Sequence, residues 1–119
     1  MPYDYARLRE IAYLASSAAA IVTNGAGAKT YVKKIILHNT NTTTETVRIY
    51  TVPDSGGAVG TASAANLWFL QTLAPNETAI ITLAGAGDPG ILLTDTNDTI
   101  QAFSTTASKV TVQVYGGAE

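Results

Sequence analysis

The residues of this chain that could do chemistry are few, and the most concentrated are oxygen-bearing side chains: Asp95, Asn97 and Asp98, with Asp88 nearby. Carboxylate and amide oxygens are the ligands that Ca²⁺ prefers. The spacing departs from the EF-hand pattern, however, and lacks its glycine and its terminal Glu. A turn in which Asx side chains satisfy their own backbone accounts for the same residues. We favour that interpretation and expect no metal site.

Two further patterns match catalytic or phosphate-binding motifs only in part. His38 is the one histidine and the chain has no cysteine, so neither type supplies a second metal ligand, and an acid–base role has no evident orienting carboxylate. Residues 85–90, GAGDPG, fit GxGxxG by letter, but that fingerprint needs a helix to open at its last glycine. Pro89 and the β-like run Ile91–Leu93 leave no room for a helix. We therefore expect no cofactor, no catalytic residue and no enzymatic activity.

Aromatic side chains could form a carbohydrate-binding platform if several of them shared one exposed face. The candidates are Trp68, Tyr31, Tyr50, Phe69, Phe103 and Tyr115. We expect Trp68 and Phe69 to belong to the core, because each buries a large apolar area. A carbohydrate-binding module therefore stays open as an alternative function.

The composition restricts the partners of the chain. Its 119 residues are 46% hydrophobic and only 13% charged, against about a quarter in a typical domain. The net charge of −2 lacks the basic excess of nucleic-acid-binding domains, and no run of about 18 apolar residues predicts a membrane span. A surface rich in Thr, Ser, Ala and Asn favours a protein that contacts neighbouring molecules.

The elements that must position these residues are short β-strands, because β-type runs alternate with turn signals roughly every 8–12 residues. The expected strands cover residues 18–23, 29–39, 46–52, 66–73, 78–83, 91–93, 99–104 and 109–115. The pattern predicts an all-β fold: a single β-sandwich, jelly-roll or immunoglobulin-like, with seven to nine short antiparallel strands and an N-terminal arm.

Several local expectations follow from turn and strand chemistry. Asn24–Gly27 is the clearest turn signal, of the kind that tight hairpins require. The last two strands should close as a hairpin across residues 105–108, and the small-residue loop 54–65 should be flexible. Lys33 and Lys34 are adjacent, so a period of two sends one of them toward the inside, near the exposed start of the strand.

Two segments are candidates for protein contacts. Residues 1–15 form either an arm or an edge strand ahead of a sandwich domain over 16–119, and an arm would become ordered on contact with a neighbour. The polar connection 39–45, NTNTTTE, joins what we expect to be a pair of strands and offers uncharged contact surface. The candidate contact residues are Tyr3, Tyr5, Arg7 and Leu8 in the first segment and Asn41, Thr42, Thr43 and Thr44 in the second.

The order of the segments carries a resemblance. A strand ending in Thr and a Gly-containing turn (AIVTNGAG) precede a strand that ends in His-Asn-Thr (YVKKIILHNTN); ETVRIYTVP, LAPNET and NDTIQAFSTTASKVTVQVYG follow. This order resembles small all-β phage virion structural proteins of the capsid decoration (cement) or head/tail accessory type. The likeness covers about residues 18–116. It implies a sandwich that oligomerises, often as a trimer, on a capsid or tail, and it supplies no catalytic residues.

Taken together, the residues and the resemblance predict a non-enzymatic virion structural protein. We expect a capsid decoration protein that oligomerises, with a trimer favoured, and binds the major capsid protein or another virion protein in the assembled shell. Its expected location is the virion, assembled in the cytoplasm of a bacterial host, with no nucleic-acid or membrane partner. A tail or neck fibre or adaptor module and a carbohydrate-binding β-sandwich module are the alternatives.

Overall fold

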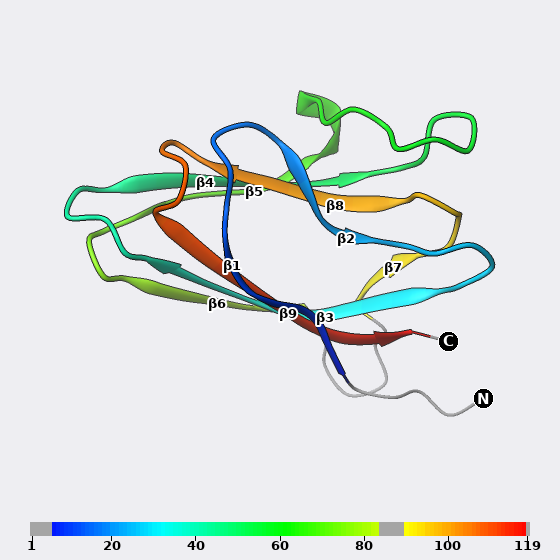
Figure 1. The fold of residues 1–119 in the computed structure, drawn as a ribbon, viewed down its shortest axis with the longest axis horizontal. Helices are drawn as coiled ribbons and strands as arrows, with labels where there is room; N and C mark the ends of the chain where they lie inside the picture. The colour runs from blue at the N-terminus through cyan, green and yellow to red at the C-terminus, as the bar shows by residue number, and fades with distance from the viewer. Residues whose placement is uncertain (1–5, 84–89, 119) are drawn as a thin grey trace.

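The chain folds into two antiparallel β-sheets packed face to face (Figure 1). This computed structural model describes residues 6–83 and 90–118. The strands are β1 (Ala6–Tyr13), β2 (Ala19–Thr23), β3 (Thr30–Asn39), β4 (Glu45–Val52), β5 (Leu67–Leu73), β6 (Thr78–Thr82), β7 (Ile91–Leu93), β8 (Thr99–Ser104) and β9 (Val110–Ala118), and a short 3-10 helix, η1 (Ala64–Asn66), precedes β5. The all-β prediction is confirmed.

The strand order is that of a jelly roll. Sheet A has the order β1-β9-β3-β6, with β7 also paired to β3, and sheet B has the order β2-β8-β4-β5. The first four strands pair with the later ones in reverse: β1 with β9, β2 with β8, β3 with β6 and β7, and β4 with β5. The chain is thus one long hairpin rolled into two layers, which is the jelly-roll arrangement. An immunoglobulin-like sandwich groups its strands differently, so the jelly roll is the alternative that forms.

Because most consecutive strands lie in different sheets, the hairpins expected from these turn signals are not formed. β8 lies in sheet B and β9 in sheet A, so residues 105–109 bridge the two layers, and the connection 40–44 does the same between β3 and β4. The turn at 24–29 likewise leads from β2 in sheet B to β3 in sheet A. Turn residues specify that the chain reverses, but they do not specify whether it reverses within one sheet or across two.

The N-terminal segment forms an edge strand over its described residues. β1 pairs with β9 along the outer edge of sheet A, in the register Arg7 opposite Tyr115 and Tyr13 opposite Thr111. Residues 1–5, where an arm was expected, lie outside the described residues.

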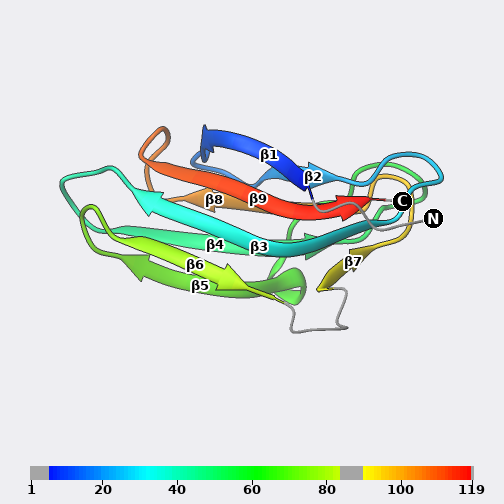
Figure 2. The ribbon, with the colours of Figure 1, turned by 90° about the horizontal axis from the view of Figure 1, so that it is seen from below.

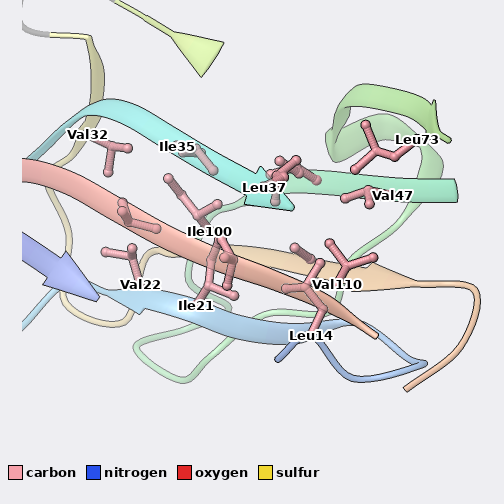
Figure 3. Close-up of a cluster of buried hydrophobic side chains, with 14 of the residues drawn as sticks. Leu14, Ile21, Val22, Val32, Ile35, Leu37, Val47, Leu73, Ile100 and Val110 are labelled. Atoms are coloured by element: carbon pink, nitrogen blue, oxygen red, sulfur yellow. The ribbon is translucent and has the colours of Figure 1, made fainter. Parts of the chain in front are cut away.

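The core lies between the sheets and follows the predicted alternation. Val47 of β4 and Val110 of β9 point inward (Figure 3). Ile49, Val112 and Val114 alternate with them along the same strands and are buried too. The buried cluster consists of Leu14, Ile21, Val22, Val32, Ile35, Leu37, Val47, Ile49, Leu73, Leu93, Ile100, Ala102, Val110, Val112 and Val114. Trp68 and Phe69 pack against this cluster and are partly buried, as expected.

The two adjacent lysines of β3 do not obey the period of two. The register of β3 against β9 shifts between Val32 and Lys34, which makes Lys33 the extra residue of a β-bulge. Both Lys33 and Lys34 are half-buried, and neither enters the core. The prediction that one lysine faces inward was wrong, because it assumed an unbroken strand.

No helix in the described part of the chain is long and apolar enough to cross a membrane.

Close approach of β9 to β3 requires glycine at position 116, and this generates a testable prediction. A Cβ on Gly116 would collide with the backbone carbonyl oxygen of Tyr31 and lie 3.0 Å from a methyl carbon of Leu8. We expect Gly116→Ala to lower the free energy of unfolding by about 1–3 kcal/mol in urea denaturation. Gly25→Ala is the matched control, since a Cβ there meets nothing within 4 Å. Equal stability of the two variants would contradict this packing.

Candidate functional site

The acidic residues meet where β4 ends and β8 begins. Carboxylate oxygens of Asp54, Asp95 and Asp98 all lie within 4.8 Å of one another. The sequence nominated Asp95 and Asp98 but missed Asp54, because only the pairing of β4 with β8 brings it there. Asp88 lies outside the described residues.

The carboxylate of Asp98 is engaged by backbone donors. Its Oδ1 accepts the N–H of Asp54 at 2.9 Å, and its Oδ2 accepts the N–H groups of Asp95 at 3.0 Å and Thr94 at 3.3 Å. Burial raises the pKa of Asp98, but the hydrogen bonds from Asp54, Asp95 and Thr94 together lower it by more than burial raises it. The pKa therefore lies below its ordinary value. The cluster stabilises a turn, as the Asx interpretation predicts.

The loop between β4 and β5 is held down by the same region. The side-chain amide of Asn97 donates to the carbonyl of Gly57 at 2.8 Å, and that of Gln101 donates to the carbonyl of Gly60 at 3.1 Å. These two bonds attach the loop to the outer face of sheet B. Val52 and Thr99 are paired on the outward side of the β4–β8 ladder, yet both are buried, because the loop lies over them.

His38 has a hydroxyl rather than a carboxylate as its hydrogen-bond partner. Its Nδ1 lies 2.7 Å from Oγ1 of Thr78, on the outer face of sheet A near the end of β3. A hydroxyl cannot orient and charge an imidazole as a catalytic carboxylate does. His38 is therefore a hydrogen-bonded side chain near a strand end.

Two of the aromatic candidates gather on the outer face of sheet B. The rings of Tyr50 and Phe103 lie 6.1 Å apart between centroids and only 11° from parallel. The guanidinium of Arg48 lies 5.6 Å from the centroid of Phe103. We call these three residues the aromatic patch; all three are half-buried.

The other aromatic candidates lie elsewhere, so the six do not form one platform. Trp68 and Phe69 contact each other edge to face at 5.9 Å and pack against the core. Tyr31 and Tyr115 belong to β3 and β9, in sheet A.

The four N-terminal contact candidates do not share one environment. Tyr3 and Tyr5 lie outside the described residues. Arg7 is exposed and forms an ion pair with Glu10 at 3.2 Å. Leu8 instead packs against the core of its own chain, so its side chain contributes to the stability of β1.

The polar connection is built on a buried asparagine. The amide nitrogen of Asn39 donates to the carbonyls of Thr43, Leu73 and Ala74, and its Oδ1 accepts the N–H of Asn41. Thr42, Thr43 and Thr44 are left exposed at the surface, with Asn41 half-buried. Side-chain bonds from Asn39 to the backbone therefore shape this connection, and the exposed face of the loop consists of threonines.

The structure does not bring the two sets of contact candidates together. Arg7 lies opposite Tyr115, whereas the connection follows Asn39, which lies opposite Val110. Those two positions of β9 are separated by five residues, or roughly 17 Å along a strand.

Sequence reasoning missed the most exposed apolar side chains. Ile11 and Tyr13 of β1 are 59% and 53% exposed, Leu70 of β5 is 53% exposed, and Ile80 of β6 is 62% exposed. The alternation in residues 78–83 did place Ile80 between two threonines on the face opposite Ile81. That was the available signal of an apolar residue directed outward.

Comparison with known proteins adds no assignment: no protein-family model matches the sequence, and no curated protein matches it significantly.

The bonding of Asp98 predicts a pH-dependent stability. Since its folded pKa is lowered, its contribution is present above its ordinary pKa of 3.8 and is lost as the pH falls through the folded value. We expect Asp98→Asn to lower the free energy of unfolding by about 1–3 kcal/mol at pH 7, and the difference from the wild type to shrink toward pH 2. Asp95→Asn, on an exposed side chain, is the control. A difference that stays constant with pH in urea titrations would refute this role.

Proposed function

We propose that this protein is a non-enzymatic virion component, a capsid decoration protein that self-associates and binds the assembled shell. The observation that carries the proposal is the outer surface of β1, where Ile11 and Tyr13 are more than half exposed on the strand that also carries the exposed, charged side chain of Arg7. We call these three residues the β1 surface. Large apolar side chains clustered in the open mark protein contact surfaces.

Four further features support this role. The jelly roll is an architecture that viral capsid proteins share with lectins. The chain is poor in charge, and the order of its segments resembles small phage virion proteins. The β1 surface also overlaps the N-terminal residues nominated as contacts, because Arg7 belongs to both sets, so the two form one continuous segment of the sequence.

Shell binding through the β1 surface can be tested by co-sedimentation with empty shells. We expect the double variant Ile11→Lys, Tyr13→Lys to weaken binding at least about tenfold, since two charges would be buried without partners. Val59→Lys is the matched control, because Val59 is 50% exposed but lies in the β4–β5 loop, over sheet B. Wild-type binding by the double variant, or absence of binding by the wild type, counts against the proposal.

A tail or neck module would use the same β1 surface on a different virion partner. Binding to tail or neck assemblies in place of shells would identify this alternative.

A carbohydrate-binding role is the second candidate, and the aromatic patch favours it. Two nearly parallel rings with an adjacent guanidinium offer apolar faces for stacking on a sugar and donors for its hydroxyls. A glycan panel would first identify the polysaccharides that the wild type retains. We expect Phe103→Ala to abolish binding to any of them in titration calorimetry. A panel without a single retained glycan removes this candidate.

A further inference from the structure

The two long sides of the sandwich differ in how their edge strands are protected. Figure 2 shows β1 along one side and β5 with β6 along the other. β1 carries three charged residues and two register shifts against β9. Charges and bulges of this kind prevent an edge strand from pairing with another chain. β5 and β6 carry no charge at all.

The free edge of β6 exposes a regular set of backbone groups. In the β3–β6 ladder, the N–H of Leu83 donates to the carbonyl of Lys33, and the N–H of Asn39 donates to the carbonyl of Glu77. These two bonds show which residue pairs of the ladder are hydrogen-bonded. Hydrogen-bonded and non-hydrogen-bonded pairs alternate along an antiparallel ladder. The backbone N–H and C=O groups of Ala79 and Ile81 therefore bond to β3. The N–H and C=O groups of the remaining residues, Thr78, Ile80 and Thr82, therefore point away from the sheet.

The sequence of β6 is complementary to itself. In an antiparallel pair centred on Ile80, Thr78 of one chain lies opposite Thr82 of the other, and Ile80 lies opposite Ile80. The three residues with free backbone groups then bond to one another across the pair. On the outer face, Ile80 would contact its own counterpart; on the inner face, Ala79 would meet Ile81 and extend the core.

The apolar side chains on this side are incompletely covered. Trp68 and Phe69 of β5 and Ala79 and Ile81 of β6 pack on the core but remain partly exposed. Leu70 and Ile80 are more than half exposed. Because no charge lies on either strand, a second copy can approach without like-charge repulsion, and a charged partner would find no counterpart.

We infer that two copies of this chain associate about a twofold axis by antiparallel pairing of β6 with β6, so that one sheet continues through both subunits. The contact is isologous, with the same surface on both copies. It produces a dimer rather than the trimer that the resemblance implies. The inference concerns self-association alone: a dimer that binds no shell contradicts only the proposed function, and a trimer that binds shells contradicts only this pairing.

Site-specific cross-linking tests the register, because the chain has no cysteine of its own. In the proposed pair the Cα atoms of the two Ile80 residues lie about 5.5 Å apart, within the range that a disulfide spans. Ile80→Cys should therefore give a covalent dimer on mild oxidation. Thr82→Cys should not, since the two positions 82 would be roughly 14 Å apart. Equal cross-linking of both variants, or none by Ile80→Cys, overturns the inference.

Sedimentation equilibrium supplies the test without oxidation. We expect the wild type to have twice the 12.4 kDa mass of the chain and Ile80→Lys to have the mass of one chain. Val59→Lys should remain dimeric. In the wild type, the amide protons of Ile80 and Thr82 should exchange more slowly as concentration rises, a readout that needs no variant. A wild-type monomer or trimer, or a dimeric Ile80→Lys, would falsify the inference.

Discussion

The antiparallel pairing of β3 with β9 is the constraint on which the rest of the structure depends. It runs from Thr30 opposite Ala118 to Asn39 opposite Val110, and thus joins residues more than seventy positions apart in sequence. β1 can join sheet A only through β9, and β6 and β7 only through β3. At the end of this ladder the buried amide of Asn39 bonds to the carbonyl of Leu73 in sheet B, which ties the two layers together. The connection 40–44 is shaped around the same side chain.

The strands were predictable because alternation is a local signal. The run expected at 46–52 is β4, Glu45–Val52, and that expected at 78–83 is β6, Thr78–Thr82. Sheet membership was not predictable, because it depends on which distant strands pair. The hairpins expected at 24–27 and 105–108 failed for that reason. A jelly roll satisfies the same turn chemistry while it sends most of its reversals across the layers.

The candidate surfaces were less predictable than the strands. Composition indicated contact-making protein surface, and the Asx interpretation of Asp98 was correct. The partner that bonds to Asp98, Asp54, lies in the loop after β4 and is found only from the fold. Ile11 and Ile80 carry the two proposed contacts. The alternation with threonines marks Ile80 as directed outward, whereas the ambiguous pattern of residues 1–15 gives no such signal for Ile11. The two proposed contact surfaces lie at opposite sides of the sandwich, so the proposed self-association would leave the β1 surface free for the proposed shell contact.

Cryo-electron microscopy of shells incubated with the protein tests the central claim most directly, because it shows location and orientation together. The account predicts density for the sandwich on the outer surface of the shell, with β1 against the shell protein and the β6 edges of two copies in contact. Density that places β1 away from the shell, or none on the shell under conditions where the protein is folded, would contradict it.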